Sequence, residues 1–133
     1  MSEARDKGLE IFREVYGDDV AEGCRQTIET GEDFNAIHAQ WSMEWAFGNL
    51  WTREALPRKM RSLAVLGMVI GLRQFEEIKY HTIMGMANGL TREEIEEVFY
   101  SAMPYCGFPI ANTAKAAMLE GFAEVEKRAA QAS

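Results

Sequence analysis

Two side chains with a spacing suited to proton transfer, Glu77 and His81, stand near the middle of the chain. Residues four apart in a helix share one face, so this carboxylate and this imidazole can meet. A neighbouring carboxylate raises the basicity of an imidazole and orients its ring, which suits a histidine that gives or takes a proton. Spacing alone nevertheless favours a plain surface pair, which stabilises a helix by about 0.3 kcal/mol.

Three further side chains are weaker candidates for chemistry. His38 lies six residues from Glu44 and therefore on a different helical face, which indicates an ordinary, partly exposed histidine. Glu44 lies between two tryptophans, so its carboxylate either points to water or is buried with a partner. Cys106 comes at a helix end, where a buried structural cysteine is the default interpretation.

Basic residues gather once in the chain, at Arg53, Arg58, Lys59 and Arg61. Cations in the first turn of a helix oppose its dipole, so Arg58 and Arg61 need another reason to be there. Arg61, with Trp51 nearby in the sequence, could hold a substrate carboxylate through two hydrogen bonds. A solvated basic turn or an intersubunit salt bridge explains the cluster equally well.

Size and composition restrict the class of protein. A chain of 133 residues with 47% hydrophobic and 26% charged residues predicts one folded domain, residues 1–133. The net charge of -7 argues against nucleic-acid binding, and the longest apolar run is too short to cross a membrane. Two unpatterned cysteines and the lack of a signal peptide predict a cytoplasmic location. The spacing of histidines, cysteines and acids predicts no metal site, and the glycines predict no phosphate loop.

Apolar periodicity and capping residues predict an all-α fold of about six to seven helices. Asp18 or Asp19 is expected to cap the second helix, Asp33 the third, and Thr91 with Glu94 forms a capping box for the sixth. The expected helices cover residues 4–16, 18–30, 34–47, 57–72, 74–88, 92–106 and 109–128, with a loop over 49–56. Three tryptophans and eight methionines are many large apolar residues for a chain of this length. We therefore expect some apolar surface to be shared with another subunit.

Several segments, in order along nearly the whole chain, give a specific resemblance. They include residues 44–51 (EWAFGNLW), 56–63 (LPRKMRSL), 77–81 (EIKYH), 88–95 (NGLTREEI) and 105–112 (YCGFPIAN). With these motifs the chain resembles the carboxymuconolactone decarboxylase family, within the alkylhydroperoxidase D-like superfamily. The resemblance implies a helical fold assembled as homotrimers or homohexamers. It also implies decarboxylation of 4-carboxymuconolactone, a small anionic substrate, to the enol-lactone of 3-oxoadipate in aromatic-compound catabolism.

Roles for individual residues follow from this resemblance. Loss of CO2 leaves a carbanion conjugated to the lactone carbonyl, so the substrate supplies its own electron sink and no cofactor is expected. The protein must supply a grip for the carboxylate, a donor for the enolate oxygen and an acid for carbon. Arg61, Trp51 and His81 are the respective candidates. The supporting candidates are Glu44, Glu77 and Cys106 for proton transfer, and Arg58 and Trp45 for substrate binding.

The departures from the family pattern bear on the alternative functions. In the redox branch of the superfamily, the two cysteine positions before the histidine correspond to Gln74 and Glu77, so a thiol peroxidase is the least favoured alternative. Glu54 stands where proline is usual, and Met84, Met86 and Ala87 alter the segment after His81. The substrate could therefore be a related lactone or keto acid, or the protein could be an oligomeric binding protein without activity.

Overall fold

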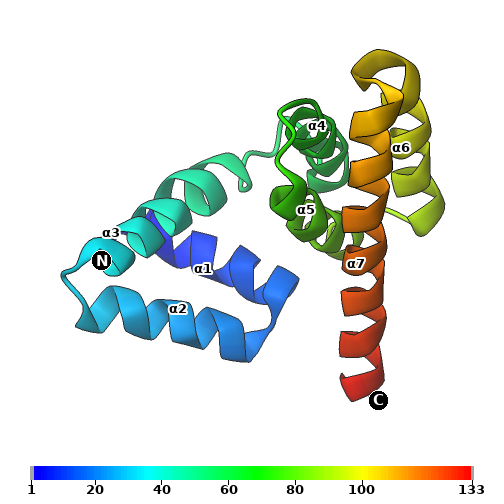
Figure 1. Cartoon of the computed structure of the whole chain (residues 1–133). Coiled ribbons are helices and arrows are strands. Elements are labelled where there is room, and N and C mark those ends of the chain that lie inside the picture. Colours follow the sequence, from blue (N-terminus) through cyan, green and yellow to red (C-terminus); the bar gives the residue numbers. More distant parts are fainter. Residues whose placement is uncertain (1, 133) are drawn as a thin grey trace. The chain divides into compact units, whose positions relative to one another are not determined.

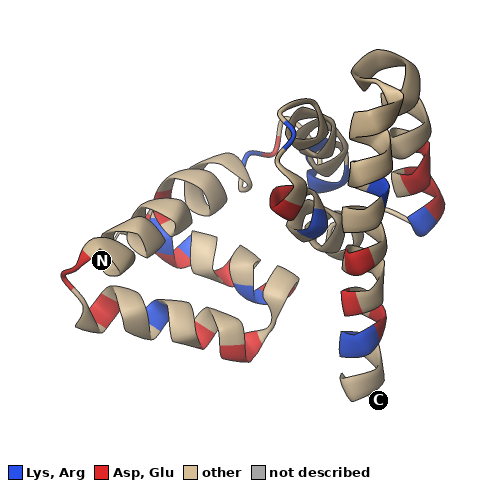
Figure 2. Ribbon diagram, viewed as in Figure 1, with Lys and Arg blue, Asp and Glu red and all other residues tan. Residues whose placement is uncertain are grey.

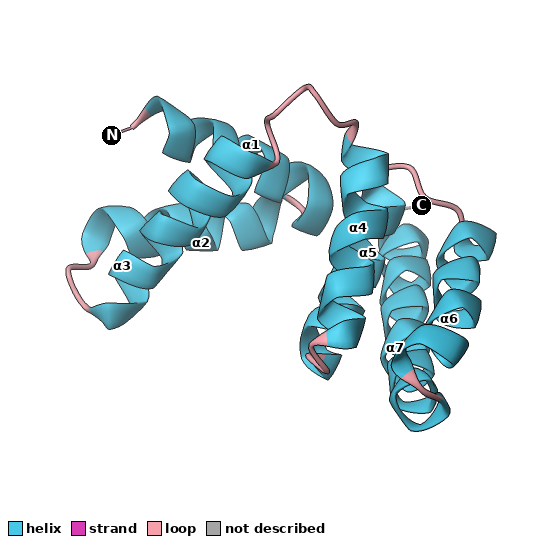
Figure 3. Ribbon diagram, turned by 90° about the horizontal axis from the view of Figure 1, so that it is seen from above, coloured by secondary structure: helices cyan, strands magenta, loops and turns pink. Residues whose placement is uncertain are grey.

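The computed structural model describes residues 2–132, and within that range it contains only helices and their connections (Figure 1, Figure 3). The elements are α1 (Glu3–Tyr16), α2 (Asp18–Thr30), α3 (Phe34–Trp41), the π-helix η1 (Ser42–Leu50), α4 (Arg58–Gly71), α5 (Phe75–Ala87), α6 (Arg92–Cys106) and α7 (Phe108–Ala132). The all-α class is confirmed. These elements form two compact units, Met1–Pro57 and Arg58–Ser133. The single domain over residues 1–133 stays a prediction.

In the first unit, α1 packs against η1 at a point where two glycines bring the backbones together. A β-carbon on Gly8 would lie 2.0 Å from the carbonyl oxygen of Met43, and one on Gly48 would lie 1.9 Å from that of Ala4. No other residue type fits at either position without moving a helix. The small core beside this crossing contains Leu9, Ile28 and Met43, with Phe12, Cys24, Ala39 and Phe47 packed against it.

The end of the third predicted helix differs from expectation. We expected an α-helix to residue 47 and a loop from residue 49, but α3 ends at Trp41 and a π-helix continues to Leu50. The amide of Trp51 donates to the carbonyl oxygen of Ala46 at 3.1 Å, a bond across five residues. Apolar periodicity does not separate four-residue from five-residue hydrogen bonding, so the sequence pattern could not reveal this segment.

The second unit packs α4, α5, α6 and α7 around one core. Its buried members are Leu66, Ile70, Ile78, Leu90, Ile95, Ala102, Ala111, Ala114, Ala117, Met118 and Phe122. Gly121 of α7 lets α5 approach closely, because a β-carbon there would lie 2.8 Å from the β-carbon of Thr82. Near the end of α4 and in the turn after it, Met68 and Leu72 are exposed.

Two predicted helix starts are confirmed by their hydrogen bonds. The Thr91 hydroxyl accepts from the Glu94 amide at 3.1 Å, and the Glu94 carboxylate accepts from the Thr91 amide at 3.0 Å. This reciprocal pair satisfies two amides that a helix leaves without internal partners. The Asp33 carboxylate likewise accepts from the amide of Ala36 at 3.0 Å.

The predicted cap of the second helix is wrong. Asp18 and Asp19 lie inside the first turn of α2, and Gly17, with φ of 94°, occupies the position before it without a side-chain cap. The positive φ explains why a glycine stands at this position, because glycine adopts such a φ without steric cost. The two aspartates still favour the helix, since negative charge suits the positive end of its dipole.

Charged residues are spread over the helices (Figure 2). Many pair within one helix, as Lys7 does with Glu3 at 2.7 Å and Arg128 with Glu124 at 3.1 Å. Lys59 of α4 instead reaches Glu94 of α6 at 3.1 Å. Exposed pairs of this kind contribute little to stability, so the cores and glycine contacts must hold the helices together. Among the described helices, none is long and apolar enough to cross a membrane.

Candidate active site

Helix α5 brings Glu77 and His81 together as their spacing predicted. The Glu77 Oε2 atom lies 3.7 Å from His81 Nε2, across one turn of the helix. The two side chains differ in exposure, since the imidazole is 17% exposed and the carboxylate 53%. The pair therefore places a largely buried imidazole beside a carboxylate that still reaches solvent.

The electrostatics of this pair are opposite to the expectation from spacing. Burial lowers the pKa of His81 below its ordinary value of 6.5, and the charge of Glu77 offsets this only in part. The free-energy cost of removing an imidazolium from water is larger than the stabilisation that a half-exposed carboxylate provides. The side chain is therefore a neutral imidazole at neutral pH until another negative charge approaches.

The rest of α5 holds His81 in a fixed place. Ile78 and Thr82, on either side of it in the sequence, are fully buried. The Thr82 hydroxyl donates to the carbonyl oxygen of Ile78 at 2.7 Å, and its methyl faces Gly121 of α7. A helix packed this closely cannot rotate without breaking these contacts, so the position of the imidazole is set by the core.

Arg61 lies on α4, the helix that precedes α5. The residue after it, Ser62, takes part in a hydrogen bond that joins α4 to the end of α5. The Asn88 amide donates to the Ser62 hydroxyl at 3.0 Å, which ties the end of α5 to α4. The Nε atom of Arg61 and the Oδ1 atom of Asn88 are buried without a hydrogen-bond partner among the described residues. Buried polar groups are usually paired, so Arg61 retains a donor that a ligand oxygen could satisfy.

Sequence reasoning gave Asn88 and Ser62 no role, although a signal was present. His81, Gly85 and Asn88 recur at positions i, i+4 and i+7, which share one face of α5. A β-carbon on Gly85 would lie 3.8 Å from the β-carbon of Ser62, so this face turns towards α4. Arg58 is the first residue of α4 and is half-buried.

The other aromatic and acidic candidates belong to the first unit. Glu44 and Trp45 lie on η1, where Glu44 is half-buried and Trp45 is exposed. Trp45 stacks on Trp41 with ring centroids 4.9 Å apart. Trp51 follows η1 and is buried, with 4% of its surface exposed. Their roles in substrate binding and proton transfer stay predictions.

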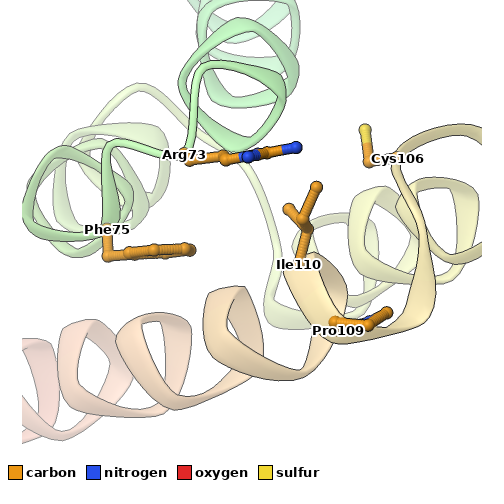
Figure 4. A pocket seen from close by; sticks show the side chains of 5 residues that line it. All are labelled: Arg73, Phe75, Cys106, Pro109 and Ile110. Atoms are coloured by element: carbon orange, nitrogen blue, oxygen red, sulfur yellow. The ribbon is translucent and has the colours of Figure 1, made fainter.

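Cys106 lies elsewhere in the second unit. It lines a cavity of about 350 Å³ with Arg73, Phe75, Pro109 and Ile110 (Figure 4). His81 is two turns further along α5 than Phe75 and does not line this cavity. The structure thus groups Glu77 with His81 and places Cys106 with a different set of side chains. A share of Cys106 in proton transfer stays a prediction.

The chain is similar in sequence to known proteins. A family model described as the carboxymuconolactone decarboxylase family matches residues 38–120, more than half of the chain. The chain belongs to this family. It is 35% identical over 104 residues to the nitrosuccinic acid decarboxylase npaB of Metarhizium robertsii, covering 78% of this chain and 71% of that protein. It is 31% identical over 108 residues to the 4-carboxymuconolactone decarboxylase of Acinetobacter baylyi, covering 81% and 78%.

The part of the chain that matches the carboxymuconolactone decarboxylase family contains all eight site residues expected from the sequence. These are Glu44, Trp45, Trp51, Arg58, Arg61, Glu77, His81 and Cys106. Both relatives are named as decarboxylases although their names give different substrates. The resemblance expected from the motifs is confirmed, and a decarboxylase reaction in general is supported.

Proposed function

We propose that this protein is a cofactor-free decarboxylase that acts on 4-carboxymuconolactone or a closely related acid, with His81 as the proton donor. The observation that carries the proposal is the likeness to two decarboxylases over more than three quarters of the chain. The buried imidazole beside Glu77, inside the segment that the family model matches, supports it with a group suited to proton transfer.

The two substrate names share three chemical features. In nitrosuccinic acid and in 4-carboxymuconolactone, a carboxylate stands on a carbon whose electrons can pass to a nitro group or to a conjugated lactone. That same carbon also carries a carboxymethyl group in both compounds. The proposed substrate class is therefore a succinate-like dianion with an electron-withdrawing group, and a lactone or keto acid of this type is expected here.

The proposed reaction balances without an added electron acceptor. The bond between the carboxylate and the ring carbon breaks, and CO2 leaves. The bonding electrons move through the conjugated system to the lactone carbonyl oxygen, which becomes an enolate. His81, as imidazolium, then gives its proton to carbon and takes another from water. Hydrogen bonds that strengthen as charge develops on the enolate oxygen lower the barrier.

Substrate binding itself supplies the protonated form of His81. Burial holds the pKa of the imidazole below 6.5 in the free protein, so it is neutral at neutral pH. A dianion placed beside it favours the imidazolium and raises that pKa. Proton uptake would then accompany binding, and the acid would be formed only where it is used.

The remaining roles follow from the charges of the substrate. We assign the carboxymethyl carboxylate to Arg61, whose Nε atom is buried and lacks a partner in the described part of the chain. A guanidinium binds a carboxylate through two parallel bonds, which fixes orientation as well as position. Glu77 is proposed to orient the imidazole, and the role of Trp51 as donor to the enolate oxygen stays a prediction from the resemblance.

A substrate panel tests this function. CO2 release is measured with 4-carboxymuconolactone, nitrosuccinate and a 3-oxo acid with a second carboxylate, against succinate as a compound without an electron sink. We expect release from at least one activated dianion and none from succinate. Folded protein that releases CO2 from none of the activated acids would contradict the proposal.

A further inference from the structure

The cavity that contains Cys106 lies at one end of the second unit, where three helix ends meet. Arg73 belongs to the turn between α4 and α5, and Phe75 begins α5. Cys106 ends α6, and Pro109 and Ile110 lie in the first turn of α7. Figure 4 shows the Arg73 and Phe75 side chains extending towards Ile110 and Cys106, with open space between them. His81 does not line this cavity.

Arg73 is held in an unusual conformation at the edge of this space. Its φ is 59°, the one positive value among the described residues other than glycine. The turn is fixed by the Arg73 amide, which donates to Ile70 at 3.0 Å, and by the Gln74 amide, which donates to Val69 at 3.0 Å. A left-handed conformation costs an ordinary residue about 1 kcal/mol. The turn therefore directs the Arg73 side chain to the cavity at some cost in stability.

The guanidinium of Arg73 is the one full charge among the five residues that line the cavity. No acidic side chain lies within 4 Å of it in the described part of the chain, whereas Arg25, Arg92 and Arg128 are paired. The partial charges of the helix ends oppose each other here, because α6 ends and α7 begins on either side of Gly107. Arg73 therefore makes the electrostatic potential of the cavity positive, which favours an anion.

The other walls are apolar. Phe75 offers a ring, Ile110 and Pro109 offer aliphatic surface, and Cys106 behaves as a small hydrophobic side chain. A volume of about 350 Å³ is at the lower end of the range for ligand pockets, so the occupant must be small. Glu76 follows Phe75 in the sequence and lines a separate cavity. The cavity beside Arg73 therefore has no carboxylate in its lining.

We propose that this cavity is a second ligand site, which binds a small monocarboxylate with an aromatic or branched apolar body. The carboxylate pairs with the Arg73 guanidinium, and the apolar body lies between Phe75 and Ile110. The alternative for Arg73 is a purely structural role, in which its charge interacts with the C-terminal end of α4. That role predicts an effect on stability and none on ligand binding.

The two cysteines provide the test, because Cys106 lines the cavity and Cys24 lies in the first unit. Alkylation of each thiol by iodoacetamide is followed by mass spectrometry while benzoate is added. We expect benzoate to slow the modification of Cys106 and to leave Cys24 unchanged. Benzamide, which lacks the charge, and acetate, which lacks the apolar body, should each protect at least about fivefold more weakly.

Variants separate the ligand site from the structural role. Arg73→Gln should weaken the protection by benzoate about five- to tenfold, because a charge-assisted pair is lost. Arg53→Gln removes the same charge from an exposed position in the first unit and should leave the protection unchanged. The Ile110 methyl resonances should shift with benzoate, with the exposed Ile37 as the control.

Three results would overturn the proposal. Equal protection by benzamide and benzoate would show that charge plays no part. Unchanged protection in Arg73→Gln would leave Arg73 with the structural role alone. Protection of Cys106 that follows protein concentration instead of benzoate would show that a second copy of the chain covers the cavity.

Discussion

At the scale of single residues, two opposing effects act on the pKa of His81. Burial lowers the pKa of the imidazole, and the Glu77 carboxylate 3.7 Å away raises it, with burial the larger effect. The spacing of the two residues was readable in the sequence, but the burial was not. Burial comes from helices that pack together in the fold, so the net direction needed the structure.

Glu77→Gln should lower the pKa of His81 further. The substitution keeps the size of the side chain and removes the charge that favours the imidazolium. A proton NMR titration of the two histidines measures this directly, with exposed His38 in the first unit as the internal control. We expect the His81 midpoint to move down. A His81 midpoint that stays or rises would show that Glu77 does not act on the imidazole.

The same burial should make stability depend on pH. The unfolded chain binds a proton at His81 near pH 6.5, whereas the folded chain binds it only at a lower pH. Between these values the unfolded state holds more protons, so His81 favours folding fully above about pH 6.5 and less as the pH falls. Urea unfolding at several pH values should show a weaker loss of stability towards acid for His81→Gln than for the unchanged protein. Equal slopes would contradict a buried neutral imidazole.

At the scale of elements, two helix starts were predictable from the sequence. Thr91 with Glu94 and the Asp33 cap have local signatures, and the structure confirms both. The π-helix from Ser42 to Leu50 has no such signature, because its hydrogen-bond pattern is not visible in apolar spacing. The glycine crossing of α1 and η1 was missed as well, since it depends on two segments distant in the sequence.

That crossing gives a matched pair of glycine substitutions. Gly8→Ala places a methyl group 2.0 Å from the Met43 carbonyl oxygen and should reduce the free energy of unfolding by about 3 kcal/mol or more. Gly23→Ala, in α2 with nothing within 4 Å, should raise it by about 0.5–1 kcal/mol. Thermal and urea unfolding measure both. A harmless Gly8→Ala would mean that α1 and η1 do not approach as closely as described.

At the scale of the whole molecule, the second unit exposes several large apolar side chains. Tyr105, Leu72 and Met68 are 91%, 68% and 61% exposed. Aromatic residues and methionine are enriched in protein interfaces, so this surface suits contact with further copies of the chain. Assembly as a homotrimer or homohexamer stays a prediction.

The mass per particle, measured by light scattering on protein separated by size, tests the assembly. Leu72→Glu and Tyr105→Glu should lower the mass per particle towards that of one chain, because each buries a charge in the expected interface. Ala129→Glu, at another exposed position on α7, is the control and should leave the mass unchanged. A single-chain mass for the unchanged protein would contradict the assembly.

Decarboxylation with His81 as the acid can be tested on a single substrate. CO2 release from 4-carboxymuconolactone is compared between the unchanged protein, His81→Gln and the control His38→Gln. We expect His81→Gln to be slower by about 10²- to 10⁴-fold, the usual worth of a positioned acid, and His38→Gln to be unchanged. Release at an undiminished rate from folded His81→Gln would contradict the claim.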